Sequence, residues 1–380
     1  MKKDPQKRPL PYKTVFACLL FFVIAVLLVS CEAQSLVGNW RGDGADTVYH
    51  SLPMTTAETS AVTTAPPVTT SAETTTALAT TAAPPVTTMP EPPGSPYYNP
   101  LSGLPCSQKE SVARPIGFCV KEAAGSVIAL ADAVIEAPTE ATATRLMLLK
   151  CGGASLWSHL TAASIRPYLA AMSHDLFAIS VYRGTSDLDR ESASFLYNTI
   201  DLRETAVQDK DPEALLAAIT AAAYQTSVAG SIALPYTLGE VGTTATPNEG
   251  RSTYVSIPYS TEAVTAFTYD PLTKSYTMRT SAALSASESV FSTFTNVLVL
   301  FHDATRRVSK DGVELTLDTA LGGTGYYISN GGHRQLLWRR DPVTSRLYFT
   351  DTDGAPLVIN RGKTYIGMTT FEYREELILN

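Results

Sequence analysis

Residues 131 to 150, with the sequence ADAVIEAPTEATATRLMLLK, constrain the fold more than any other stretch of the chain. Two short apolar runs lie at its ends, and such runs are typical of strands that are buried on both faces. Pro138, in the middle, disfavours a helix. We therefore predict two core strands joined by a polar bend. The charged and polar side chains at the mouth of the core would then be Glu136, Glu140, Thr144 and Arg145.

These polar residues have two interpretations. A buried carboxylate beside an arginine is costly unless the two groups are paired, so one interpretation is a structural ion pair. Charged groups also gather at ligand-binding and catalytic sites, where a pair of glutamates can serve as acid and base. The sequence leaves both interpretations open.

Composition narrows the classes of partner. The chain has 380 residues, of which 44% are hydrophobic, which is enough for two domains with real cores. Its net charge is −7, and because the first 30 residues hold five basic residues and one acidic residue, a net +4, the remainder carries −11. An acidic remainder argues against a nucleic-acid partner and against electrostatic adhesion to anionic lipid. The five cysteines form no C-x-x-C pair, so we predict no metal and no cofactor.

The start of the chain has the features of an export signal. Residues 1–13 are basic, and residues 15–29 form an unbroken apolar run that suits a signal peptide better than a membrane-spanning helix. The run ends in Leu-Val-Ser-Cys, which resembles a bacterial lipobox and predicts a signal peptide over residues 1–30 with lipidation at Cys31. Two acyl chains on this cysteine would give stable anchoring. The alternatives are an uncleaved signal anchor and a plain secretory signal.

A low-complexity segment follows. Between residues 53 and 96 the composition is mostly Thr, Ala and Pro, and APPVTT occurs at 65–70 and again at 83–88. Such a segment cannot form a packed core and is expected to be extended. We predict that residues 31–97 are the anchor and a tether that holds the rest away from the membrane.

Residues 98–240 mix strand and helix patterns, which predicts a mixed α/β domain. The turn-forming residues NPLSGLP at 99–105 mark its start. Besides the two strands of the 131–150 stretch, strands are predicted at 114–120 and 176–182. Helices are predicted at 164–172 with Ser164 as cap, at 190–200, and at 211–224, where Asp211 precedes Pro212.

Residues 250–375 show the alternation of a mostly antiparallel β domain, so the predicted fold class is α+β. Residues 322–325 are predicted to form a bend or a bulge, and residues 351–354 to form a hairpin turn rather than a calcium loop. Short strands at this spacing are typical of a sandwich or barrel-like meander. The predicted strands are 253–260, 264–270, 275–280, 297–302, 313–318, 325–329, 335–340, 346–350, 356–360 and 364–368.

Several of these stretches resemble the YerB-like lipoproteins, exported proteins of Gram-positive bacteria with a two-part domain of unknown function. NPLSGLP, ADAVIEAPTEATATR and SIRPYL are similar to the N-terminal half of the family. GGTGYYISNGGHRQLLWRRD and TDTDGAPLVINRGKTYIGM are similar to its C-terminal half. The resemblance implies that the family's characteristic positions are held here by Glu136, Glu140, Thr144, Arg145 and Arg166.

The chain also departs from the family pattern. Lys121 and Glu122 stand where the family usually has paired asparagines, and Arg183 stands near the place of a common histidine. If the polar set forms the family's site, this member has changed it or lost it.

The anchor, the tether and the lack of a catalytic motif predict a lipid-anchored binding or scaffolding protein on the outer face of the cytoplasmic membrane. The expected partners are the membrane, through the anchor, and a cell-wall polymer or an envelope protein. The alternative is an envelope-polymer hydrolase or transferase, with Glu136 and Glu140 as acid and base and with Arg145 and Arg166 orienting an anionic substrate. A third interpretation is a degenerate family member that keeps only a useful fold.

Overall fold

The computed structural model describes residues 96–139, 142–184, 198–205, 207–208, 210–228, 232–280, 292–309 and 312–380. The predicted leader, Cys31, nearly all of the tether and Glu140 lie outside these residues. The helices within them are short, and none combines the length and the apolar character that crossing a bilayer requires.

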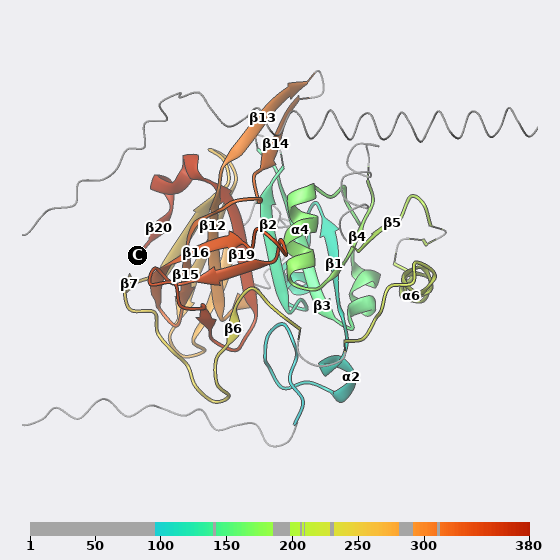
Figure 1. Cartoon of the computed structure of the whole chain (residues 1–380), viewed down its shortest axis with the longest axis horizontal. Coiled ribbons are helices and arrows are strands. Elements are labelled where there is room, and N and C mark those ends of the chain that lie inside the picture. Colours follow the sequence, from blue (N-terminus) through green and yellow to red (C-terminus); the bar gives the residue numbers. More distant parts are fainter. Residues whose placement is uncertain are drawn as a thin grey trace, which may run out of the picture. The chain divides into compact units, whose positions relative to one another are not determined.

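Most of the described strands join one mixed sheet (Figure 1). Its eleven strands among the described residues follow the order β17-β16-β15-β12-β19-β2-β3-β1-β4-β5, and β7 pairs with β16. Their bounds are β1 (Pro115–Val120), β2 (Ala133–Pro138), β3 (Thr144–Cys151), β4 (Ile179–Tyr182), β5 (Thr199–Asp201), β7 (Gly250–Arg251), β12 (Asn296–His302), β15 (Gly322–Ser329), β16 (Gly332–Arg340), β17 (Leu347–Thr350) and β19 (Thr364–Thr370).

Seven strands of this sheet run in the same direction, and six of them, all except β16, have a parallel neighbour. β12, β19 and β2 are parallel neighbours, as are β1, β4 and β5. β3 is antiparallel to both β1 and β2, so these two also share a direction. The last residues of the six strands therefore meet at one edge, where β3 begins. We call this the carboxyl edge and the opposite one the amino edge.

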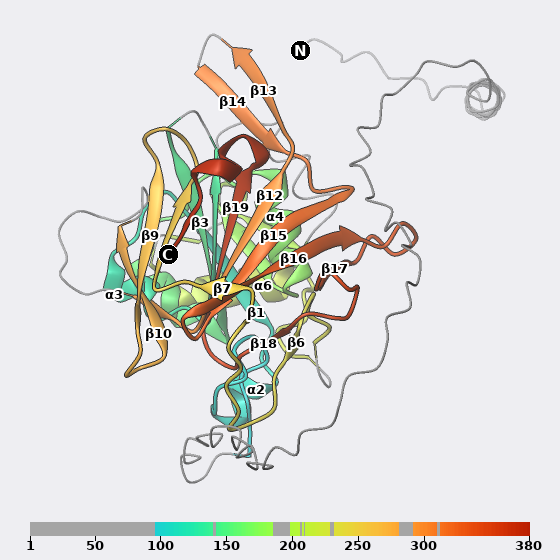
Figure 2. The same ribbon diagram turned by 90° about the vertical axis from the view of Figure 1, so that its left-hand side faces the viewer.

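Two layers cover the faces of the central strands. A five-stranded sheet in the order β11-β10-β9-β8-β20 packs on one face, where Val134 and Leu146 point. Helix α4 (Pro167–Asp175) lies across the other face, where Ile135 and Met147 point (Figure 1). Successive side chains of a strand alternate between faces, so neighbouring residues of β2 and β3 belong to different layers. The strands of the smaller sheet are β8 (Tyr254–Pro258), β9 (Val264–Asp270), β10 (Ser275–Thr280), β11 (Thr293–Phe294) and β20 (Ile378–Leu379), with β9 and β10 at the left of Figure 2.

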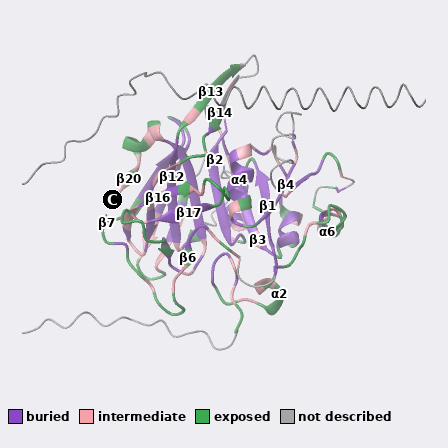
Figure 3. Ribbon diagram, viewed as in Figure 1, coloured by how far each residue is buried: buried purple, intermediate pink, exposed green. Residues whose placement is uncertain are grey.

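The remaining elements are small. β13 (Ala304–Ser309) and β14 (Gly312–Leu317) form a hairpin, and β13 is largely exposed in contrast to the buried central strands (Figure 3). β6 (Thr237–Leu238) pairs with β18 (Val358–Ile359). The other helical segments are α2 (Gln108–Ser111), α3 (Gly125–Ile128), η1 (Gly153–His159), α6 (Pro212–Ala221) and η2 (Phe371–Glu376).

Local signals predicted many elements correctly. The predicted hairpin 264–280 is β9 and β10, with the expected bounds. α6 begins at Pro212, and the side chain of Asp211 accepts hydrogen bonds from the backbone N–H groups of Glu213 and Ala214. An aspartate cap followed by proline satisfies the free donors of the first turn and presets the backbone there. This helix is therefore confirmed.

Three predicted elements were wrong in part. The helix expected from Ser164 begins at Pro167, with Arg166 at the cap position, because proline is favoured in the first helical turn. Thr199 and Ile200, expected to be helical, lie in strand β5, while residues 190–197 lie outside the described residues. Residues 322–325 lie in strand β15 and not in a bend. A Cβ on Gly323 would lie 2.6 Å from the Phe301 carbonyl oxygen, so glycine here permits close approach of two strands.

The fold is rich in strands and has few helices. β12 and β19, from the predicted C-terminal domain, lie in the same sheet as β1 to β5, from the predicted N-terminal domain. The division into domains at residues 240–250 stays a prediction, and the joint between the halves is a continuous sheet where β19 pairs with β2.

Candidate functional site

The predicted site residues that the structure describes lie near the carboxyl edge. Glu136 is in the second half of β2, and Thr144 and Arg145 are the first residues of β3. Arg166 precedes α4, and the hydroxyl of Tyr168 in the first turn donates a hydrogen bond to the carbonyl of Pro138 at the end of β2. The edge therefore brings the two arginines and Glu136 to one end of the sheet.

The two faces of the sheet divide this set. Leu146 and Leu148 point toward the smaller sheet, whereas Met147 and Leu149 point toward α4. By the same alternation Thr144 shares the face of the smaller sheet and Arg145 shares the face of α4. Glu136 lies directly across from Leu146 in the antiparallel pair and so shares its face. Glu136 and Arg145 thus lie on opposite sides of the sheet, and the predicted bend does not gather them on one rim.

Glu136 is completely buried, and hydroxyl groups from both halves of the chain donate to it. Thr144 Oγ1 lies 2.8 Å from Oε1, and Thr265 Oγ1 lies 2.8 Å from Oε2. The hydroxyl of Tyr365 also donates to Oε2 and lies 2.6 Å from the hydroxyl of Tyr259. This network joins β2 and β3 to β9 and β19, and we call it the Glu136 network.

The electrostatics of the Glu136 network follow from its burial. The pKa values of Tyr259 and Tyr365 are raised well above the usual range for tyrosine, first by burial and then by the charge of Glu136. Both phenols therefore stay protonated and serve as hydrogen-bond donors. Because Glu136 has no exposed surface, a substrate in solution does not reach it in this conformation.

Arg145 and Arg166 both lie close enough to Cys119, on the other face, for their charges to affect its thiol. Burial raises the pKa of Cys119 to about 12, and the positive charges of Arg145 and Arg166 both oppose that rise. Cys119 Sγ donates to the carbonyl oxygen of Ser164 at 3.3 Å, just before the start of α4. The two guanidinium groups are therefore near neighbours of the same buried thiol. We call Arg145 and Arg166 the arginine pair.

The Arg145 side chain is only partly satisfied. Its Nη1 atom donates to the Thr144 carbonyl oxygen at 3.1 Å. Its Nε atom is buried and has no hydrogen-bond partner among the described residues. An unsatisfied buried donor on a cation is unfavourable unless an acceptor is supplied.

A hollow lies at the end of β1. It has a volume of about 500 Å³, and its rim carries Lys121, Glu122 and the exposed side chain of His159. Ala162 pairs with Val120, and Ala163 N–H donates to the Cys119 carbonyl oxygen at 2.8 Å, so the wall of the hollow is fixed to β1. Ligands of open sheets with parallel strands bind outside the carboxyl ends of the strands, which is where this hollow lies.

Sequence reasoning missed His159. It lies at the end of η1, nearly forty residues from the end of β1, and no short motif links the two segments. Lys121 had a signal, because polar residues directly after a buried strand of parallel type are candidates for a site. Within the described parts of the chain, no group of three or more His, Cys, Asp or Glu side chains is placed to hold a metal ion. No disulfide joins Cys106, Cys119 and Cys151, the cysteines that the structure describes.

Comparison with known proteins matches both the sequence and the fold. Residues 255–366 match the family model described as the C-terminal domain of a protein of unknown function, DUF3048. The crystal structure of the YerB protein from Bacillus subtilis superposes with a TM-score of 0.53 and 18% sequence identity, covering 72% of this chain and 96% of that one. Together the two matches support a divergent member of the YerB-like family. No curated protein matches it.

These matches confirm the resemblance seen in the sequence. At this level of identity the solved structure supports the fold alone. The activity of this YerB-like chain must be argued from its own side chains, and the carboxyl edge is where they suggest one.

Proposed function

We propose that this YerB-like protein is a lipid-anchored binding protein of the cell envelope that recognises an anionic group at its carboxyl edge. One observation carries the proposal. Arg145 and Arg166 lie beside the same buried thiol, and the Nε atom of Arg145 is buried with no acceptor among the described residues. A phosphate or carboxylate oxygen would supply that acceptor.

The chemistry of the arginine pair favours such a ligand. Guanidinium groups present fixed forks of donors that match carboxylate and phosphate groups in two-point hydrogen bonds. Partial burial strengthens these interactions because water screens them less. The hollow at the end of β1, at about 500 Å³, is large enough for part of a polymer repeat or a small ligand at the same edge of the sheet. Phosphate-bearing or carboxylate-bearing wall polymers are therefore the ligand class that we propose.

The N-terminal sequence supports the location. The basic segment, the apolar run and the lipobox-like residues before Cys31 are consistent with export and lipidation, and the Thr, Ala and Pro segment is consistent with a tether. In this arrangement the carboxyl edge would reach polymers beyond the outer face of the membrane.

The geometry favours binding over catalysis by Glu136. This glutamate has no exposed surface and lies across the sheet from Arg145, so it is not positioned beside an anion held by the arginine pair. Its partner in the catalytic alternative, Glu140, lies outside the described residues. We do not extend the proposal to a hydrolase or transferase.

The test is binding of the full-length chain in detergent to purified anionic and neutral wall polymers. Arg145→Gln and Arg166→Gln each remove one guanidinium, and we expect each to weaken binding of the anionic polymer by about tenfold or more. Arg339→Gln is the matched control, because Arg339 is an exposed arginine on β16. Equal binding by all three variants, with unchanged thermal stability, would rule out the arginine pair as the site.

The location is tested by separating cells that express the protein into membrane fraction, soluble fraction and medium. Cys31→Ser removes the atom that accepts the lipid, so the variant is expected in the medium or the soluble fraction while the parent stays in the membrane fraction. A variant that remains in the membrane fraction, uncleaved, would instead indicate a signal anchor.

A further inference from the structure

A second hollow lies at the amino edge, at the other end of the strands from the arginine pair. It has a volume of about 470 Å³ and is lined by two arginines, Arg346 and Arg361. β6 and α2, which adjoin it, lie at the lower end of the sheet in Figure 1. Its walls include the apolar side chains of Ile232, Leu234 and Leu238.

Arg361 is held in a fixed position. Its Nε donates to the Gly239 carbonyl oxygen at 2.7 Å, and its Nη1 donates to the Gly103 carbonyl oxygen at 3.0 Å. Its guanidinium carbon lies 5.0 Å from the centroid of the Tyr98 ring. A cation that is held by two carbonyls and an aromatic face loses little conformational entropy when a ligand arrives.

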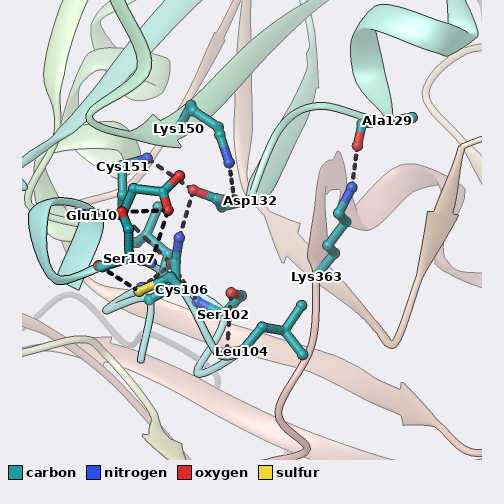
Figure 4. Close-up of polar contacts among 12 residues, drawn as sticks. Ser102, Leu104, Cys106, Ser107, Glu110, Ala129, Asp132, Lys150, Cys151 and Lys363 are labelled. Carbon is teal, nitrogen blue, oxygen red and sulfur yellow. Dashed lines mark hydrogen bonds and ion pairs between the residues drawn. The ribbon is translucent and has the colours of Figure 1, made fainter. Parts of the chain in front are cut away.

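The wall that carries Tyr98 is equally well fixed, through Asp132 (Figure 4). The buried Asp132 accepts hydrogen bonds from Asn99 Nδ2 at 2.9 Å, from Lys150 Nζ at 2.9 Å and from the backbone N–H of Cys151 at 2.8 Å. The Asn99 Oδ1 atom in turn accepts hydrogen bonds from the backbone N–H groups of Leu101 and Ser102. The NPLSGLP segment is therefore a rigid wall of this hollow and not a loose loop.

The charge balance of the hollow is unusual for this protein. The whole chain has a formal charge of −7, yet none of the described residues lining the hollow is an aspartate or a glutamate. Neither Arg346 nor Arg361 forms an ion pair with a described carboxylate. Arg346 is exposed, and its guanidinium makes a long contact of 3.5 Å to the Leu234 carbonyl oxygen. Two positive charges therefore face the same cavity, and no described carboxylate lines it.

We propose that the amino-edge hollow binds a small amphipathic anion. A carboxylate or phosphate group pairs with Arg346 and Arg361, because a guanidinium offers these groups two parallel hydrogen bonds. A planar apolar body packs against Tyr98 and the aliphatic wall formed by Leu234 and Leu238, which removes apolar surface from water.

This site is independent of the arginine pair. The hollow lies at the amino edge, shares no lining residue with the hollow at the end of β1, and makes no use of export or lipidation. Failure at one site therefore leaves the other proposal intact.

Isothermal titration calorimetry on the full-length chain tests the proposal. The probes are phenyl phosphate, benzoate, inorganic phosphate and benzyl alcohol, which separate the contributions of charge, apolar body and anion type. We expect phenyl phosphate or benzoate to bind about tenfold tighter than inorganic phosphate and than benzyl alcohol. The better of the two aromatic anions identifies the anionic group.

Variants locate the binding. Arg346 is exposed and forms no ion pair with a described carboxylate, so Arg346→Gln is expected to keep the thermal stability of the parent. The same variant is expected to bind the aromatic anion about tenfold more weakly. Arg361→Lys keeps the positive charge but loses the two parallel donors of the guanidinium, so it is also expected to bind phenyl phosphate more weakly. Arg307→Gln, at an exposed position on β13, is the matched control and should bind like the parent.

Three results would overturn the proposal. The first is no heat of binding for either aromatic anion at millimolar concentration. The second is equal binding of benzyl alcohol and benzoate, which would remove the role of charge. The third is unchanged affinity in a folded Arg346→Gln variant, which would place the bound anion elsewhere.

Discussion

Glu136 is a single carboxylate that accepts hydrogen bonds from three strands. Thr144 belongs to β3, Thr265 to β9 and Tyr365 to β19, and all three hydroxyl groups point to this one side chain. An ionised carboxylate suits the position because it only accepts hydrogen bonds, and every neighbour in the network is a donor. The residue is thus more important to the joint between the two halves than to a surface site.

Changing Glu136 to glutamine tests that role. The amide keeps one acceptor oxygen but places an NH₂ group against hydroxyl donors, so at least one buried donor loses its partner. We expect Glu136→Gln to lower the free energy of unfolding by about 2 to 4 kcal/mol, measured by urea unfolding. Tyr259→Phe, which removes only the outer hydroxyl of the network, is the control and should cost about 1 kcal/mol. Equal stability of Glu136→Gln and the parent would contradict this account.

His302 gives a second prediction, concerning pH. It is fully buried at the end of β12, its Nδ1 lies 2.9 Å from the Asp318 carbonyl oxygen, and its ring packs 4.3 Å from the Trp338 ring. Burial lowers its pKa to about 4, with a smaller lowering by the charge of Arg340. The unfolded chain therefore binds a proton at this residue between about pH 6.5 and pH 4, while the folded chain does not.

The sign of the pH effect follows from that difference. The contribution of His302 to the free energy of unfolding is fully present above about pH 6.5 and is lost as the pH falls toward 4. Between pH 7 and pH 5 the free energy of unfolding is expected to fall by about 2 kcal/mol for this reason. Urea unfolding at these two values measures it. In His302→Gln this part of the pH dependence should be absent, while the contributions of other groups remain. The same change with pH in parent and variant would show that His302 does not titrate as we infer.

The placement of single residues was predictable only where local alternation decides it. The pattern of β3 separates Arg145 from Leu146, so the face of Arg145 follows from the sequence once the strand is recognised. The partners of Glu136 do not follow, because Thr265 and Tyr365 lie 129 and 229 residues away. Nothing in the spacing of such residues encodes their contact. The predicted rim site was therefore split between two faces.

At the scale of elements, those with complete local signals were predicted best. β9 and β10 have clear alternation and a turn between them, and α6 has its cap and its proline. α4 was misplaced because Ser164 is a good cap in isolation, whereas its carbonyl accepts a hydrogen bond from Cys119 Sγ and the helix starts at Pro167. β15 was shortened in the prediction because its glycines suggest a bend until the neighbouring strand is known.

At the scale of the whole molecule, the order of strands could not be predicted. β19 lies between β12 and β2, and residues Thr364 to Gly367 pair with Ala133 to Glu136. The sequence has a change of rhythm near residue 250, which suggests two separate domains, but strand pairing across that point depends on contacts that no local pattern contains.

The shared sheet predicts how fragments behave. Residues 96–245 and residues 246–380, expressed separately, would each expose an apolar strand edge, β2 in one and β19 in the other. We expect each fragment alone to aggregate or to lack a cooperative thermal transition, and the two expressed together to form a soluble complex. Calorimetry and gel filtration measure both outcomes. A cooperative transition in each separate fragment would instead support two independent domains.

The position of β19 also affects how quickly a new chain can mature. Its residues 364–370 fill the centre of the sheet beside β2, a strand that is synthesised more than two hundred residues earlier. Contacts between such distant segments slow folding, and the apolar flank of β2 stays open until they form. The first half of the chain alone therefore has an incomplete sheet with an exposed apolar edge. During that interval the open edge of β2 makes the chain prone to aggregate.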